Sequence, residues 1–215
     1  MTPKLTRTLL EFHRSPNSVK VRVALGFKGL EYEIQEMMAA DRAPMTEAAG
    51  WPLVPILLDG DVVMRDSMAI LHCLEANYRQ TPSLTPSSRD DILTAEALLA
   101  RLNPELLGIP WSLRGEIEKP EEERDRERIE AARSKLVATL ARLDERLSAD
   151  PWLVGQALSI YDIVLACNLL PMRPPPVFAD QSPVWRFFME RLRLDGHVPA
   201  VESWVDRVLA QDGKL

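Results

Sequence analysis

Residues 51–67 constrain the fold of this chain more than any other segment. The apolar runs at 54–58 and 62–64 each indicate a strand. Asp59-Gly60 between them is typical of a type I′ hairpin turn, because that turn needs positive φ. Asp66-Ser67 then places an acid and a hydroxyl at the start of a helix. The segment therefore predicts an antiparallel hairpin that leads directly into a helix.

A strand, a helix and a second strand are indicated before this segment. Residues 9–12 indicate a strand, and Ser15-Pro16 is typical of a helix start. The helix is expected to end at Lys28-Gly29, since a glycine just past the last turn is a common cap. Residues 32–37 alternate as a strand does. Two strands joined through a helix predict a parallel pair, and residues 38–52 are expected to be a loop with one helical turn.

The rest of the chain has a different pattern. Residues 81–88 are rich in Pro, Ser and Thr, which is typical of a linker. Beyond them the periodicity is helical, and apolar residues at 129–147 recur every three or four positions on one helix face. The sequence therefore predicts a mixed α and β domain at 1–80, a linker at 81–88 and an all-helical domain at 89–215.

Composition and charge argue against several classes of protein. The formal net charge of -6 opposes non-specific nucleic-acid binding, which needs a basic surface. No apolar run reaches the roughly 20 residues that span a bilayer, and no secretory signal is evident, so we expect a cytoplasmic protein. Cys73 and Cys167 are predicted to be buried reduced thiols. His13, His72 and His197 lack metal-ligand spacing, so we expect no metal.

Three short motifs could carry chemistry, and each has an alternative structural role. Ser15 could donate its hydroxyl to an anion or thiol at the positive end of the helix dipole, or serve only as an N-cap. Val54-Pro55 could form a cis peptide whose Val54 backbone binds a peptide-like ligand, or hold a trans proline at the start of the strand. Asp66-Ser67 could bind the ammonium and carboxylate groups of an α-amino acid, or Ser67 could simply cap the helix.

In this order, the motifs resemble the cytosolic glutathione transferase family, as a serine-type or bacterial-like member, over nearly the whole chain. The similarity is carried by an active-site segment, a cis-proline, an acid–serine motif, a capping box and the start of the last helix. They lie at residues 15–22, Val54-Pro55, 66–70, 159–162 and 197–204. The resemblance implies an α+β thioredoxin-like N-terminal domain, an all-helical C-terminal domain, a homodimer, and glutathione as co-substrate.

The resemblance assigns a role to each site residue. Ser15 would hydrogen-bond the glutathione thiolate and lower the thiol pKa. Val54-Pro55 would bind the cysteinyl backbone of glutathione, and Asp66-Ser67 would bind its γ-glutamyl end. A small hydrophobic electrophile would lie between Ser15 and the helical domain, with Trp111 and Arg114 as pocket walls.

Three positions depart from the family pattern. Pro52-Leu53 stands where much of the family has Gly followed by Lys or Gln, so the usual contact with the glycine carboxylate is missing. Arg42 or Trp51 could substitute for it. Asn17 replaces a Cys of some serine-type members and is a further candidate glutathione contact. Ser15 and Ser18 occupy the cysteine positions of redox relatives, which argues against thiol–disulfide exchange.

The sequence leaves three functions open. The first is a transferase that adds glutathione to a small electrophile. The second is a non-catalytic binding or regulatory protein, which the missing contact at Leu53 motivates. The third is a glutathione-dependent isomerase or dehalogenase, which would share the glutathione site and differ only in the electrophile pocket.

Overall fold

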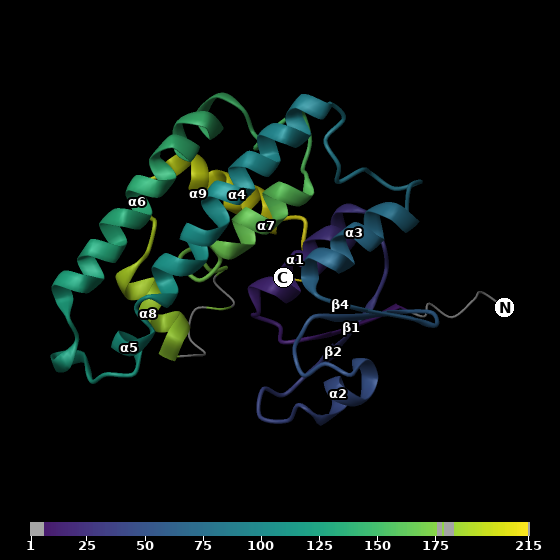
Figure 1. The fold of residues 1–215 in the computed structure, drawn as a ribbon, viewed down its shortest axis with the longest axis horizontal. Helices are drawn as coiled ribbons and strands as arrows, with labels where there is room; N and C mark the ends of the chain where they lie inside the picture. The colour runs from purple at the N-terminus through teal and green to yellow at the C-terminus, as the bar shows by residue number, and fades with distance from the viewer. Residues whose placement is uncertain (1–6, 176–177, 179–182, 215) are drawn as a thin grey trace. The chain divides into compact units, whose positions relative to one another are not determined.

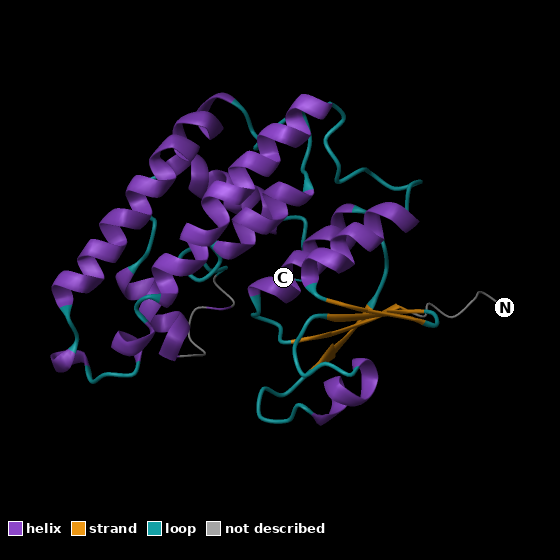
Figure 2. Ribbon diagram, viewed as in Figure 1, coloured by secondary structure: helices purple, strands orange, loops and turns teal. Residues whose placement is uncertain are grey.

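The chain forms two compact units in a computed structural model that describes residues 7–175, 178 and 183–214. One unit extends to Thr85 and also contains Ala210–Lys214, whereas the other comprises Pro86–Leu209. The strands all belong to the first unit, and the described part of the second is built from helices (Figures 1 and 2). The predicted order of a mixed domain and an all-helical domain is confirmed, while the bounds 1–80, 81–88 and 89–215 stay a prediction.

The first unit is built on a four-stranded mixed sheet in the order β2-β1-β3-β4. β1 (Arg7–Glu11) pairs in parallel with β2 (Glu33–Glu36) and antiparallel with β3 (Ile56–Asp59). β3 in turn pairs antiparallel with β4 (Val62–Arg65), and Gly60 has a φ of 61° in the turn between them. Both the parallel pair and the hairpin predicted from the sequence are therefore present.

Helices cover both faces of this sheet. α1 (Pro16–Phe27) and α3 (Ser67–Asn77) pack together on one side, and α2 (Ala43–Ala49) lies on the other (Figure 1). α2 is longer than the single turn that the sequence indicated. Its N-cap residue is Arg42, and Pro44 lies in the first turn, where the missing N–H of a proline costs no helical hydrogen bond.

The central strands are apolar on both faces because both faces are covered. Leu10 and Ile56 pack in one cluster with Met45 of α2. Leu9 and Leu57 alternate to the opposite face and are also fully buried. Burial on two sides explains why these strands show little alternation of polar and apolar residues.

A buried lysine fastens the end of the first unit to its helices. The Lys28 ammonium group lies 2.8 Å from a Glu75 carboxylate oxygen and donates to the hydroxyl of Thr81 and the carbonyl of Pro82. Glu75 also accepts hydrogen bonds from the Ser83 hydroxyl and the Leu84 amide. The start of the predicted linker is therefore held against α1 and α3.

The second unit is organised around α7 (Ile160–Asn168), which is buried along almost its whole length. α7 contacts α4 (Arg89–Trp111) and α9 (Pro199–Leu209), and α6 (Arg126–Ala149) packs against both of these helices. The amphipathic run predicted at 129–147 lies within α6. Shorter helices complete the described part of the unit, namely α5 (Arg114–Ile117), the 3-10 helix η1 (Glu121–Glu123) and α8 (Pro183–Arg191).

The predicted capping box begins α7. The Ser159 amide donates to the Asp162 carboxylate at 3.0 Å, and the Asp162 amide donates to the Ser159 hydroxyl. The buried Asp162 carboxylate also accepts from the Leu153 amide at 2.9 Å and the Trp204 indole at 2.8 Å. Because one carboxylate joins three chain segments, the motif stabilises the fold of this unit.

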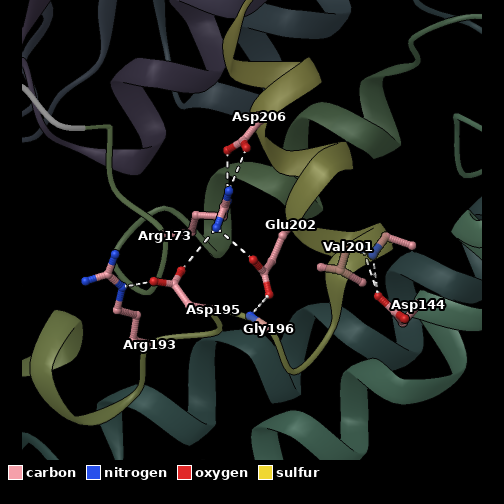
Figure 3. Close-up of polar contacts among 9 residues, drawn as sticks. Asp144, Arg173, Arg193, Asp195, Gly196, Val201, Glu202 and Asp206 are labelled. Carbon is pink, nitrogen blue, oxygen red and sulfur yellow. Dashed lines mark hydrogen bonds and ion pairs between the residues drawn. The ribbon is translucent and has the colours of Figure 1, made fainter.

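Arg173, which follows α7 and is partly exposed, connects this part of the chain to α9. The Arg173 guanidinium pairs with both Asp206 oxygens at 2.7 and 2.8 Å, and with Glu202 at 2.9 Å and Asp195 at 3.1 Å (Figure 3). Glu202 also accepts from the Gly196 amide at 2.6 Å. These bonds fix the turn that precedes α9.

Two expectations from composition can be compared with the structure. Cys167 is buried as predicted, but Cys73 is only half-buried. Neither thiol forms a disulfide with a described residue. Within the described ranges, no helix is both long enough and apolar enough to cross a membrane.

The Lys28–Glu75 pair predicts a specific dependence of stability on pH. Burial alone would raise the pKa of Glu75, but hydrogen bonds from Lys28, Ser83 and Leu84 lower it from 4.5 to about 2. A lowered pKa in the folded state stabilises the protein above the unfolded pKa, and this stabilisation is lost as pH falls from 4.5 toward 2. Glu75→Gln should cost about 2 kcal/mol at neutral pH, discounted for partial exposure, and almost nothing at pH 2. Urea unfolding from pH 7 to pH 2 measures this, and a cost that is equal at both extremes contradicts it.

Candidate functional site

Pairing in the sheet brings the predicted motifs to one edge. Leu10 near the end of β1 lies opposite Ile56 at the start of β3, and Ile56 lies opposite Arg65 at the end of β4. The residues just beyond these three positions therefore leave the sheet at the same edge, where these strand ends meet. They include Ser15 after β1, Val54 before β3 and Asp66 after β4.

Ser15 has a hydroxyl that α1 does not use. It is the N-cap residue with φ −64° and ψ 123°, and Pro16 follows it, as the sequence predicted. Its amide donates to the Phe12 carbonyl at 2.8 Å, and its carbonyl accepts from the Val19 amide at 2.9 Å. The half-buried side chain makes no capping bond to the described helix, so its hydroxyl is available at the positive end of α1.

The two neighbouring candidates are placed differently. Ser18 is fully buried, and its hydroxyl oxygen has no hydrogen-bond partner among the described residues. Asn17 is exposed, and its side-chain oxygen accepts from the Lys20 ammonium group at 2.9 Å. Of the two serines, Ser15 is therefore the one that a ligand can reach more easily.

The Val54-Pro55 peptide is cis, which is one of the two forms the sequence allowed. Pro55 is buried and precedes the first residue of β3, so its missing N–H removes no bond from the sheet. Val54 is half-buried, and no backbone hydrogen bond to a described residue occupies its amide or carbonyl. Its backbone can therefore pair with an extended peptide-like ligand.

Asp66, and not Ser67, is the N-cap of α3, which corrects one reading of the sequence. Its carboxylate accepts from the Ala69 amide at 3.0 Å. Ser67 is instead the first helical residue and is only 6% exposed. Asp66 has φ 69°, and positive φ is uncommon for a residue other than glycine. Such strained residues cluster at ligand sites, where the surrounding structure holds them in place.

Arg42 lies beside the segment that departs from the family pattern. Its guanidinium donates to the Pro52 carbonyl at 3.0 Å and lies 5.0 Å from the centre of the Phe12 ring. Trp51 is partly exposed, and its ring is covered by the Arg65 guanidinium at 5.4 Å. Arg42 thus brings a positive charge to the position where Leu53 cannot supply one.

Trp111 and Arg114 belong to the helical unit. Trp111 ends α4, is 55% exposed and contacts the edge of the Phe188 ring at 6.2 Å. Arg114 begins α5 and forms an exposed ion pair with Glu118 at 3.6 Å. Their predicted role as walls of an electrophile pocket stays a prediction.

One cluster near Ser15 has ligands that a metal ion could use. Donor atoms of Glu11, His13 and Glu36 lie within 4.8 Å of one another. However, a Glu11 oxygen already accepts from the Arg22 guanidinium at 2.6 Å, and this nearby positive charge opposes a cation. The expectation that the protein needs no metal stays a prediction.

Comparison with known proteins decides the family. The domain family "Glutathione S-transferase, N-terminal domain" matches residues 9–82, and "Glutathione S-transferase, C-terminal domain" matches residues 126–207. The chain belongs to the glutathione S-transferase family. The thioredoxin-like N-terminal domain predicted from the sequence is thereby confirmed.

Individual glutathione S-transferases show how distant the relationship is. Glutathione S-transferase U14 of Arabidopsis thaliana is 25% identical over 92% of this chain and 78% of its own length. Glutathione S-transferase Z1 of the same plant is 38% identical, but the match spans only 35% of this chain and 36% of that relative. The similarity is therefore strongest over part of the chain.

Solved glutathione S-transferase structures show the same fold. The tau-class enzyme of mango, Mangifera indica L., superposes with a TM-score of 0.74 at 20% identity, over 95% of this chain and 89% of that one. The theta-class protein of Xanthomonas axonopodis pv. citri, solved with glutathione bound, gives a TM-score of 0.64 at 27% identity, over 94% of this chain and 97% of that one.

Most of the candidate residues lie inside the matched N-terminal domain. The range 9–82 contains Ser15, Arg42, Val54 and Asp66. Trp111 and Arg114 fall between the two matched ranges. The sequence did not indicate that Glu11 of β1 would pair with Arg22 of α1. The available signal was that each is a charged residue within an otherwise apolar run.

The strained Asp66 predicts an unusual order of variant stabilities. Asp66→Ala loses the cap and keeps the strain, whereas Asp66→Gly loses the cap and relieves the strain. The glycine variant should therefore be more stable than the alanine variant by more than about 1 kcal/mol in urea unfolding. Asp125 is the matched control, because it caps α6 with an ordinary φ of −73°. An equal difference between Gly and Ala at positions 66 and 125 would contradict strain at Asp66.

Proposed function

We propose that the protein is a glutathione transferase that activates the glutathione thiol for attack on a small hydrophobic electrophile. The observation that carries this proposal is the Ser15 hydroxyl, which stands unused at the start of α1 at the same sheet edge as Val54 and Asp66. The theta-class relative of Xanthomonas axonopodis pv. citri supports it, since that protein was solved with glutathione bound.

In the proposed mechanism, Ser15 donates a hydrogen bond to the glutathione sulfur. The positive end of α1 adds a second stabilising field for negative charge at the same place. Both interactions favour thiolate over thiol, so they lower the thiol pKa and increase the nucleophilic fraction at neutral pH. The thiolate then attacks the electrophilic carbon, and the leaving group departs with the bonding electrons.

The other residues position the peptide part of glutathione. The Val54 backbone, preceding Pro55, would pair with the cysteinyl residue as a short added strand. Asp66 would attract the γ-glutamyl ammonium group, while Ser67 and the amides at the start of α3 would bind its carboxylate. Asn17, exposed at the start of α1, is a further contact in this proposal.

Arg42 would hold the glycine carboxylate. It carries no carboxylate partner among the described residues, and its bond to the Pro52 carbonyl ties it to the loop that precedes Val54. A guanidinium can bind a carboxylate with two parallel hydrogen bonds, which makes it a suitable replacement for Lys or Gln at position 53.

The electrophile site and the oligomeric state are further parts of the proposal. Trp111 and Arg114 would line the electrophile pocket. Leu93 and Leu107 lie about four turns apart on α4, on nearly the same face, and are 52% and 41% exposed. An exposed apolar helix face of this kind supports a homodimer, in which a second copy would cover it. A cytoplasmic location fits the expected supply of glutathione.

Replacing Ser15 tests the catalytic role. Ser15→Ala should lower kcat/KM for glutathione and a general aryl halide by on the order of 10²-fold, because one positioned donor to the thiolate is lost. Ser18→Ala, which removes a buried hydroxyl in the same helix, is the matched control and should keep most of the activity. Retained turnover in Ser15→Ala would remove Ser15 from the mechanism.

Absence of calorimetric binding by the native protein at millimolar glutathione would refute the transferase and favour a protein of another function on this fold.

Truncating Arg42 tests the glycine-carboxylate contact. Arg42→Ala should weaken glutathione binding about tenfold, the usual size of one charged contact in a partly exposed site. The dipeptide γ-glutamylcysteine lacks the glycine, so it should bind the native protein and Arg42→Ala equally well in calorimetry. Arg79→Ala, which removes an exposed arginine of the same unit, is the control. An equal loss of affinity for both peptides would assign Arg42 a structural role only.

A further inference from the structure

A segment distant in sequence completes the unit that holds Ser15. Ala210–Lys214 follows α9, yet it belongs to the same compact unit as the sheet, and we call it the returning segment. It lies so close to α1 that a Cβ atom added at Gly26 would be 1.9 Å from the Gln211 carbonyl oxygen. Only a glycine at position 26 permits this approach, so the returning segment packs directly against α1.

The returning segment supplies one of two carboxylates to a buried arginine. The Arg22 Nε donates to Asp212 Oδ2 at 2.7 Å, and Arg22 Nη1 donates to Glu11 Oε2 at 2.6 Å. All three side chains are fully buried. Burial alone would lower the pKa of Arg22, but Asp212 and Glu11 raise it, so the guanidinium stays charged. Breaking such a buried pair leaves an uncompensated charge, which is strongly unfavourable.

The same guanidinium reaches the backbone just before Ser15. Arg22 Nη1 also donates to the His13 carbonyl at 2.8 Å. The His13 amide donates to Glu36 at 3.0 Å, and the Ser15 amide donates to the Phe12 carbonyl at 2.8 Å. The turn that presents Ser15 is therefore held by Arg22 on its carbonyl side and by β2 on its amide side.

We propose that Arg22 and Asp212 are positioning residues for Ser15. Asp212 orients the guanidinium of Arg22, Arg22 fixes the His13 carbonyl, and this fixes the turn that aims the Ser15 hydroxyl. Arg22 Nη2 has no partner among the described residues, so the orientation depends on the bonds to Asp212, Glu11 and His13. The consequence for catalysis rests on the proposed function of Ser15, whereas the consequence for the turn does not.

Amide hydrogen exchange tests the positioning without any ligand. In Asp212→Asn, exchange at the Ser15 and Val19 amides should become about tenfold faster or more, because the turn opens locally. Asp206→Asn is the matched control, since it removes a carboxylate from the Arg173 ion pair in the helical unit (Figure 3). It should leave exchange at these two amides unchanged. Equal exchange in Asp212→Asn and the native protein overturns the proposal.

A second variant moves the returning segment without altering a charge. Gly26→Ala should displace Gln211 and Asp212 and produce the same faster exchange at Ser15. Gly108→Ala is its control, because an added Cβ there meets nothing within 4 Å. If Asp212→Asn does not fold, this pair decides the question, and unchanged exchange in Gly26→Ala overturns the proposal.

A ligand experiment separates positioning from general stability. The thiol pKa of bound glutathione, followed by ultraviolet absorbance of the thiolate well below the unfolding temperature, should rise in Asp212→Asn, and kcat should fall. Affinity for S-methylglutathione, which has no thiol, should stay within about twofold of the native value, since Val54 and Asp66 are untouched. An unchanged thiol pKa overturns the role in aiming Ser15. Failure of the native protein to bind glutathione refutes the proposed function instead, and the exchange experiment still decides whether the turn is held.

Discussion

The antiparallel pairing of β1 with β3 is the constraint on which the rest of the structure depends. It joins the two most buried strands, and it places the end of one beside the start of the other. A slip of one residue in this pairing would move Leu9 to the face of the sheet where Leu10 now lies, and Leu10 to the opposite face. Each side chain would then pack against the wrong helix layer. The same slip would carry Ser15 out of line with Val54. Core packing and site geometry are therefore fixed by a single register.

Charge is used differently in the two units. In the first, the Lys28 and Arg22 side chains are buried, and their pairs with Glu75 and Asp212 join parts of the chain that are far apart in sequence. In the second, the Arg173 cluster is partly exposed and joins the residues after α7 to α9. Buried pairs contribute little net stability but penalise any arrangement that separates them. The buried pairs of the first unit therefore determine which chain segments meet there more than they add to its stability.

Local signals explain what the sequence could predict. The Asp59-Gly60 turn, the Ser159–Asp162 box and the start of α1 at Ser15-Pro16 all follow from the preferences of adjacent residues. The cap of α3 was less clear, because Asp66 and Ser67 suit the same position and only the backbone geometry distinguishes them. The place of Arg42 beside Pro52 depends on how a loop folds over the sheet, which no local pattern encodes. The Arg22–Asp212 pair joins residues 190 positions apart, so it could not be read from spacing.

The return of Ala210–Lys214 to the first unit also has a consequence for how the protein is made. On the ribosome, the strands, α1 and α3 emerge long before Asp212 does, so during synthesis Arg22 has only the partners already translated. Domains generally fold as units in the order in which they appear. Here the unit translated first must wait for the helical unit to be finished before its buried arginine is fully paired. The sheet-containing unit, although translated first, is therefore the last part of this chain to become complete.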